Sequence, residues 1–353
     1  MTKQFGGKVT KELKAHYASS PQWREGQFMN LEETTMEFNF RDVPKLLYKQ
    51  FVQTKDRMPK TPLSIAPLDL NSFLAPSEQP KFIWYGHSVL LMRWLDKTIL
   101  IDPMLGPDAP PIVPFAAKRF SKNTLDLIDH FPQIDLLLMT HDHYDHLDHA
   151  SIQKLKSKAS KWLVALGVSR HLESWGIPKS EIQEFDWWDN ANYNGIQFTF
   201  TPSRHFSGRG LKDRAKSLWG GWVMKSANHN LYWSGDGGYG EHFKDIGEKF
   251  GPFDFGFIEC GQYNEHWHQI HMYPEEAVQA AIDSQVKKMM PVHWGAFALA
   301  LHSWHDSIQR AQQEAKKLGV ELVTPSLGQS ISLQEEYSQN HWWLDYMEDL
   351  TLT

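Results

Sequence analysis

Cysteine is almost absent from this chain, which has Cys260 alone in 353 residues. A disulfide framework is therefore excluded, and the fold must rest on a hydrophobic core, for which this length is ample. Long apolar runs are also missing. No stretch approaches about 18 consecutive apolar residues, so we expect no transmembrane helix. Residues 1–30 lack the apolar segment of a secretory signal, which makes a cytoplasmic protein the default expectation.

A surplus of positive charge is lacking as well. The formal net charge is −6 and the pI is about 6.3, whereas nucleic-acid-binding domains usually present a basic face. We therefore expect no nucleic-acid partner. Aromatic residues are frequent, with 15 Trp and 20 Phe. Most of them should pack in the core, but such side chains also suit peripheral contact with a membrane surface.

The chain divides into two regions of different pattern. Residues 1–80 contain no long periodic segment, with Arg41–Thr54 as the single candidate helix, and we interpret them as an extended arm packed on a domain of residues 81–353. From Lys81 onwards short apolar strands follow one another, beginning with Phe82–Trp94 and Thr98–Asp102. Pro103–Phe120 is a long apolar loop with five prolines. Loops of this length in compact domains are usually lids or binding loops.

Four potential metal ligands lie within one short turn. Thr140–Asp148 reads T-H-D-H-Y-D-H-L-D and follows Ile134–Met139, an apolar run that predicts a buried strand. The candidate ligands in the turn are His141, His143, Asp145 and His146. Such a turn opens into the cleft where open α/β sheets usually place their ligands. Imidazole and carboxylate together suit zinc, iron or manganese better than calcium or magnesium.

The same arrangement recurs later in the chain. His205, Asp236 and His293 each follow a short apolar strand. Histidines placed at random would not repeatedly fall at strand ends. Layered sheets with outer helices and ligands at one rim predict an α+β fold, a single αββα sandwich with a metal site between its two sheets.

In order and spacing, these residues resemble the ligands of the metallo-β-lactamase fold hydrolases. Four further motifs resemble the N-acyl-phosphatidylethanolamine-hydrolysing phospholipase D branch: L-W-G-G-W at Leu218–Trp222, F-G-P-F-D at Phe250–Asp254, P-E-E-A-V at Pro274–Val278 and H-W-G-A-F-A at His293–Ala298. The resemblance extends from Lys81 to Leu301. It implies a metallo-β-lactamase fold for the domain of residues 81–353.

The resemblance also implies a two-metal site. One ion would be held by His141, His143 and His205, and the other by Asp145, His146 and His293, with Asp236 bridging the two. We expect two zinc ions, although such ligands also accept iron or manganese. A site of this kind activates water for hydrolysis, and we take Asp145 as a catalytic residue as well as a ligand.

Two positions depart from the pattern of that branch. Gly237 stands where a hydroxyl residue is expected after the bridging aspartate. Tyr273 replaces the aspartate of His-x-Asp-Pro before the helix that begins at Pro274. An aspartate N-cap contributes about 1 kcal/mol, so the change could alter how His271 is held. His271 is our candidate proton donor to the leaving group, and a structural histidine beside the helix is the alternative.

Substrate choice must come from the loops around the metals. Met104, Phe115 and Phe120 are candidates for contact with acyl chains, unless their loop only packs on itself. Arg204 and Arg209 are candidates for contact with a phosphate, unless they belong to a solvated face. The resemblance implies a phospholipid whose distal P–O bond is cut, giving an N-acylethanolamine and phosphatidic acid.

Other functions are open at this point. A lactone, a thioester or another carboxylic ester is an alternative substrate, because a two-metal site polarises a carbonyl as readily as a phosphoryl group. A non-catalytic lipid-binding protein would be expected to have lost a ligand, and all seven are present. The sequence does not indicate the oligomeric state.

Overall fold

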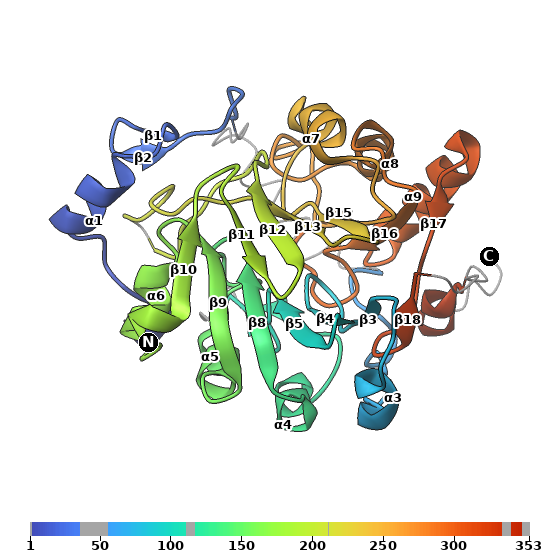
Figure 1. Ribbon diagram of the computed structural model, residues 1–353. Coiled ribbons are helices and arrows are strands. Elements are labelled where there is room, and N and C mark those ends of the chain that lie inside the picture. Colours follow the sequence, from blue (N-terminus) through green and yellow to red (C-terminus); the bar gives the residue numbers. More distant parts are fainter. Residues whose placement is uncertain (1, 36–55, 111–116, 211, 334–339, 348–353) are drawn as a thin grey trace.

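Two seven-stranded β-sheets face each other (Figure 1) in the computed structural model, which describes residues 2–35, 56–110, 117–210, 212–333 and 340–347. The strand order of the first sheet is β10 (Ile182–Phe185), β9 (Ala159–Ala165), β8 (Ile134–Met139), β5 (Lys97–Ile101), β4 (Leu90–Trp94), β3 (Lys81–Trp84) and β18 (Ser330–Ser332). The strand order of the second sheet is β11 (Asn190–Tyr193), β12 (Ile196–Thr201), β13 (Gly221–Lys225), β14 (Asn230–Trp233), β15 (Phe255–Glu259), β16 (Lys288–Val292) and β17 (Glu321–Leu322).

Helices cover the outer faces of both sheets (Figure 1). On the side of the first sheet lie α4 (Leu127–His130), α5 (His149–Leu155) and α6 (Ser169–Ser174), and on the side of the second lie α7 (His242–Phe250), α8 (Pro274–Asp283) and α9 (Asp306–Leu318). The predicted αββα sandwich is thus confirmed. Among the described residues, no helix combines the length and the apolar character needed to cross a bilayer.

Parallel pairing explains why most of the strands before the candidate ligands are so apolar. In β8, which pairs in parallel with β5 and β9, every residue except Asp135 is buried. Parallel strands are covered on both faces, so they read as continuous apolar runs. In the second sheet, β14, β15 and β16 also pair in parallel. The residues that follow these strands therefore gather at one rim of the sandwich.

The N-terminal region contains several short elements. It contains a short 3₁₀ turn η1 (Thr2–Phe5), the helices α1 (Lys11–Tyr17) and α3 (Leu70–Leu74), and the two-stranded ribbon of β1 (Trp23–Arg24) and β2 (Gln27–Phe28). Tyr17 and Phe28 are buried in the main hydrophobic core. The candidate helix Arg41–Thr54 lies outside the described residues.

The expectation of one strand over Phe82–Trp94 is wrong. β3 and β4 form an antiparallel hairpin in which Trp84 pairs with Leu90, and the connecting turn includes Gly86 and His87 at positive φ. Glycine adopts such a conformation readily. The turn matters because it carries His87 to the metal ligands.

The remaining short elements lie in the connections. The loop Pro103–Phe120 contains the ribbon of β6 (Asp108–Ala109) and β7 (Ala117–Lys118). Single 3₁₀ turns are η2 (Thr124–Asp126), η3 (Lys179–Glu181) and η4 (Trp342–Tyr346).

Candidate metal centre

The histidine turn between β8 and α5 is fixed at both of its ends. The carboxylate of Asp102, which follows β5, accepts hydrogen bonds from Thr140 N at 2.9 Å and Thr140 Oγ1 at 2.7 Å. Asp148 caps α5 by accepting the N–H of Ser151 at 2.9 Å. With both ends held, His141, His143, Asp145 and His146 come together with ligands from later in the chain.

A first group of ligands consists of His141, His143 and His205. Their ligand atoms lie within 4.8 Å of one another, and His205 Nε2 is 3.1 Å from His143 Nδ1. Burial, with the nearby His143 and His141 rings adding to it, holds the pKa of His205 well below its usual value. Neutral imidazole is the form that binds metals. These three residues therefore offer three nitrogen ligands to one ion.

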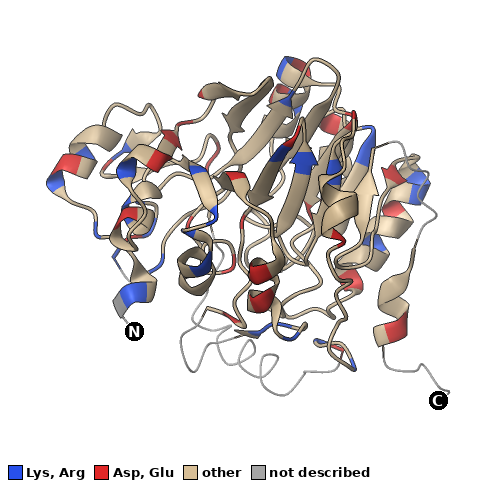
Figure 2. Ribbon diagram, turned by 60° about the horizontal axis from the view of Figure 1, so that its bottom comes forward, with Lys and Arg blue, Asp and Glu red and all other residues tan. Residues whose placement is uncertain are grey.

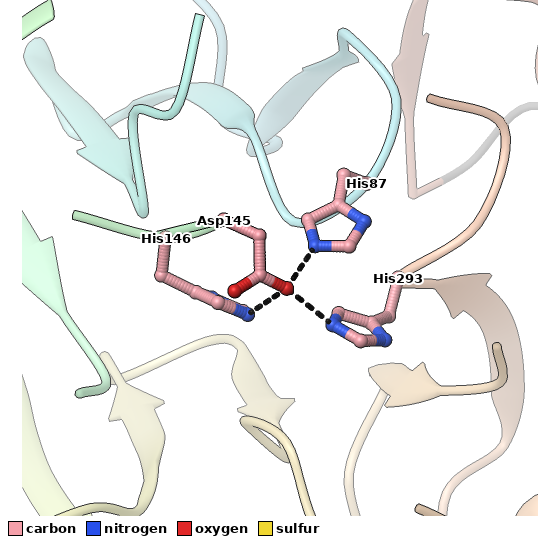
Figure 3. Close-up of side chains that lie close together, drawn as sticks. All are labelled: His87, Asp145, His146 and His293. Carbon is pink, nitrogen blue, oxygen red and sulfur yellow. Dashed lines mark hydrogen bonds and ion pairs between the residues drawn. The ribbon is translucent and has the colours of Figure 1, made fainter. Parts of the chain in front are cut away.

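The second group consists of Asp145, His146 and His293, which point toward one another in Figure 3. Asp145 Oδ2 lies 3.4 Å from His293 Nε2 and 3.7 Å from His146 Nε2. Burial disfavours a charged His146, but the carboxylates of Asp236, Asp145 and Asp102 outweigh it and raise its pKa to about 10. Metal binding at this group must therefore displace a proton, as is usual for histidine ligands.

Asp236, after β14, reaches both groups. Its Oδ2 lies 2.8 Å from His293 Nε2 and 2.9 Å from His146 Nε2 in the second group. The same atom lies 3.9 Å from His141 Nε2 and 4.0 Å from His205 Nε2 in the first. One carboxylate oxygen in contact with both groups is the geometry that a bridging ligand requires.

Outer hydrogen bonds orient the ligand rings. Asp102 Oδ2 lies 2.9 Å from His146 Nδ1, the carbonyl of Ile270 lies 3.0 Å from His205 Nδ1, and Glu259 Oε1 lies 3.3 Å from His293 Nδ1. Each contact directs the opposite nitrogen into the site, as partners of metal-bound histidines usually do. His141 Nε2 is buried without a hydrogen-bond partner. The donor set and its orientation fit two divalent metal ions.

His87 was not identified from the sequence, yet it lies directly beside Asp145 (Figure 3). Its Nε2 is 2.8 Å from Asp145 Oδ2, and its ring centroid is 4.0 Å from that of His293. Burial is the main cause that lowers the pKa of His87 to about 3. The neutral ring can therefore donate Nε2–H to Asp145 and hold that carboxylate in position.

We expect the substitution His87→Ala to weaken metal binding about 10- to 100-fold, the range found for outer partners of metal ligands. Titration with a competing chelator would measure this affinity. His87→Gln retains a donor and should fall between the wild type and His87→Ala, while exposed His130 on α4 serves as the control, with His130→Ala binding metal as the wild type does. Equal affinity for all variants would contradict the role of His87.

Asp142 lies between the first two histidines but faces away from the metal ligands. It is fully buried and lies 3.1 Å from His171 Nε2 and 3.3 Å from Arg170 Nη2. It also accepts hydrogen bonds from Gly208 N at 2.7 Å and from the Ser217 hydroxyl. Asp142 thus ties the histidine turn to α6 and to the loop that follows His205.

The N-terminal region contributes directly to this centre through Asn30. The Asn30 side chain donates to the carbonyl of His205 at 2.8 Å and accepts the N–H of His205 at 3.1 Å. Its oxygen also accepts Nε1–H of Trp219 at 3.0 Å. Both main-chain groups of a metal ligand are therefore held by a residue 175 positions earlier.

The model of one protein family, described as the beta-lactamase superfamily domain, matches residues 97–294, which span all of β5 to β16. The chain belongs to this superfamily. All seven predicted ligands lie at residues 141–293, and thus within the matched region.

Two relatives match this superfamily member over different extents. An uncharacterised protein of Mycobacterium tuberculosis is 34% identical over 94% of this chain and 89% of its own length. An N-acyl-phosphatidylethanolamine-hydrolysing phospholipase D of Caenorhabditis elegans is 31% identical over 63% of this chain and 65% of its own length.

A solved structure supports the fold. The metallo hydrolase of the archaeon Ignicoccus hospitalis aligns with a TM-score of 0.57 at 20% identity, covering 74% of this chain and 100% of that protein. At this identity the likeness concerns the fold alone, which is the metallo-β-lactamase fold predicted from the sequence.

His271 lies at the edge of the metal centre of this superfamily member. A ligand atom of His271 lies within 4.8 Å of those of His205 and Asp236, and its Nδ1 is 3.2 Å from Glu259 Oε1. Glu259 therefore contacts both His271 and the ligand His293. At the start of α8, Glu276 accepts the N–H of Tyr273 at 2.9 Å. Glu276 thus provides a hydrogen-bond acceptor at the start of the helix in place of the missing aspartate, and Glu259 holds His271.

Gly237, the second departure, is explained by close packing. A Cβ atom at this position would lie 3.1 Å from Arg204 N and 3.3 Å from Ser203 Cβ. A larger side chain would therefore require the main chain at Arg204 to shift.

The predicted phosphate-binding arginines make extensive contacts within the chain. Arg209 is buried and donates to the carbonyls of Asp142 and Leu147, each at 2.7 Å, and to that of Gln4. Arg204 donates to the Glu33 carbonyl at 2.8 Å and to Thr34 Oγ1 at 3.1 Å. Both side chains fasten the N-terminal region to the loop that carries His205, and their contact with a substrate stays a prediction.

The three residues predicted to contact acyl chains do not lie in one common cluster. Met104 is buried in a small cluster with Ala109, Ala296 and Phe297. Phe120 is also buried, and its ring centroid lies 6.0 Å from that of Trp304. Phe115 lies outside the described residues. A substrate contact for these three side chains stays a prediction.

Proposed function

We propose that this chain is a two-metal phosphodiesterase that hydrolyses a phospholipid of the N-acyl-phosphatidylethanolamine type to an N-acylethanolamine and phosphatidic acid. The observation that carries the proposal is the position of Asp236 Oδ2, within 4.0 Å of ligand nitrogens from both histidine groups. Two metal ions a few ångströms apart suit the two oxygens of an in-line phosphoryl displacement. Zinc is the metal we propose, since imidazole and carboxylate ligands suit it.

The substrate class rests on a relative rather than on geometry. The similar nematode protein is named for this phospholipase activity and is 31% identical. A nuclease on the same fold is not favoured, because the formal net charge is −6 and Lys and Arg are interspersed with Asp and Glu in the view of Figure 2. Phosphate-backbone binding depends on a basic face.

The chemistry divides between the metals and the side chains. When bound, two divalent ions would supply Lewis acidity towards the phosphate and a water of lowered pKa as the nucleophile. Asp145, whose side chain is 16% exposed, can orient the attacking water through its carboxylate. His271 can give its proton to the departing ethanolamide oxygen, since it lies beside His205 and Asp236 and is oriented by Glu259.

Metal analysis combined with a substrate panel tests the proposed function. The purified chain is expected to contain two metal ions and to release phosphatidic acid from N-acyl-phosphatidylethanolamine, with His143→Ala as the inactive control. The panel should include a lactone and a simple carboxylic ester. Turnover of these two without turnover of the phospholipid would show a carboxylic-ester hydrolase instead. Fewer than two metals together with lipid binding and no turnover would favour a non-catalytic lipid-binding protein.

We expect His271→Ala to reduce kcat about 10²- to 10⁴-fold, the usual contribution of a general acid, and to leave the metal content unchanged. Steady-state kinetics and metal analysis on the same sample measure both quantities. A substrate with a better leaving group needs less protonation, so the loss should be smaller with a nitrophenyl phosphodiester. Unchanged turnover would mean that His271 has a structural role only.

A further inference from the structure

A pocket of about 420 Å³ lies between the N-terminal region and the loop that carries His205. Apolar side chains from both sides line it, among them Met29, Leu31, Phe206 and Ile270. Its volume falls within the range of small-molecule sites, which are mostly apolar with a few polar groups. None of the candidate substrate-binding residues considered so far lines this pocket.

Phe206 connects the pocket to the metal centre. Its ring lines the pocket, and its centroid lies 4.5 Å from that of His143 and 5.1 Å from that of His205. The pocket therefore reaches His205 itself and lies one aromatic ring away from His143. A molecule with a phosphate at the metals can extend past Phe206 into it.

Arg214 supplies a positive charge at this junction. Its guanidinium carbon lies 4.0 Å from the centroid of the Phe206 ring, and the side chain is exposed. Within the described residues no hydrogen bond or ion pair to Arg214 is found. The guanidinium groups of Arg204 and Arg209, in contrast, donate hydrogen bonds within the chain. A guanidinium has five N–H donors and pairs well with phosphate oxygens. Stacking on Phe206 holds Arg214 beside the pocket, where its N–H donors meet no acceptor among the described residues.

The acidic residues that line the pocket do not neutralise Arg214. Glu32 Oε1 accepts the N–H of Glu241 at 3.0 Å, and Glu33 is exposed to solvent. The pocket thus combines apolar side chains with a cation, Arg214, that stacks on Phe206 beside the metal centre. That combination matches an anionic amphiphile.

We propose that this pocket binds the apolar chain next to the substrate's phosphate, with Arg214 pairing to a phosphate oxygen. The inference rests on the proposed phosphodiesterase function. It adds the place where the apolar chain of the substrate binds. The N-terminal region then forms part of the substrate site, because Met29 and Leu31 line the pocket while the neighbouring Asn30 holds His205.

Calorimetric binding of dodecyl phosphate to the full-length chain tests the inference without turnover. Arg214→Gln is expected to weaken binding about 10-fold or more, because a hydrogen bond to a charged group contributes about 1.5–3 kcal/mol. Met29→Trp should weaken dodecyl phosphate binding by narrowing the pocket and leave binding of inorganic phosphate unchanged. Lys212→Gln removes an exposed cation outside the pocket and is the matched control, with wild-type affinity.

The outcomes separate this inference from the proposed function. Dodecyl phosphate affinity equal to that of inorganic phosphate, or unchanged in both Arg214→Gln and Met29→Trp, overturns the pocket assignment even if phospholipid is hydrolysed. Affinity that depends on Arg214 and Met29 in a chain without phospholipase activity supports the pocket and overturns only the proposed substrate.

Discussion

The substitution Asp236→Ala is expected to reduce hydrolysis about 1,000-fold and to lower the metal content from two ions per chain. Its Oδ2 is the atom that contacts both ligand groups, at 2.8 Å from His293 Nε2 and 3.9 Å from His141 Nε2. Lewis-acid stabilisation of the transition state is worth several kcal/mol, and each 1.36 kcal/mol is about tenfold in rate. Hydrolysis rates and metal analysis measure the two effects.

Two further variants serve as controls for Asp236→Ala. Glu248→Gln removes an exposed carboxylate on α7 and should leave both quantities unchanged. Asp236→Asn keeps the size of the side chain but loses its charge, so it should retain the fold while binding less metal. An Asp236→Ala variant with two tightly bound metals and full activity would rule out the shared ligand.

Asp142→Ala is expected to lower the free energy of unfolding by about 3–5 kcal/mol, the usual cost of removing one partner from a buried ion pair. The substitution leaves Arg170 and His171 buried without their carboxylate. Burial opposes the charge on Asp142, but His171 and Arg170 outweigh it and hold the pKa of the carboxyl well below its usual value. Its contribution is therefore present at neutral pH and is lost only when strong acid protonates the folded state.

Urea unfolding at neutral pH measures this change. Asp142→Asn still accepts the N–H of Gly208 and should cost less than Asp142→Ala. Glu173→Ala, an exposed position on the same helix as Arg170 and His171, should change the free energy of unfolding by less than about 0.5 kcal/mol. A loss of that small size in Asp142→Ala would contradict the structural role of the buried carboxylate.

The sandwich and the ligand set could be predicted because both leave a local pattern. Each ligand segment follows an apolar strand. For β8, β14 and β16, parallel pairing favours apolar residues along the strand, whereas β12, before His205, pairs antiparallel. The same pattern could also have identified Asp102 and Glu259, which end the strand-like runs Thr98–Asp102 and Phe255–Glu259. A histidine cluster, however, marks the residues that bind metal and leaves the carboxylates that orient them unmarked.

Other residues could not be identified in this way. His87 could not be recognised as a turn residue, because Phe82–Trp94 is apolar enough to predict one strand. In the structure this segment is divided by the turn at Gly86. Asn30 acts through contacts with main-chain atoms, and an asparagine in an irregular segment carries no periodic signal. The pocket beside Phe206 likewise depends on how residues far apart in sequence meet.

The contact between Asn30 and His205 also has a consequence for the order in which the protein assembles. Asn30 leaves the ribosome 175 residues before the ligand that it holds, so the N-terminal region must wait undocked during most of synthesis. Contacts so distant in sequence form late, because the chain between them must first be ordered. The three-histidine group therefore reaches its final geometry only once the earliest-made part of the chain has returned to it.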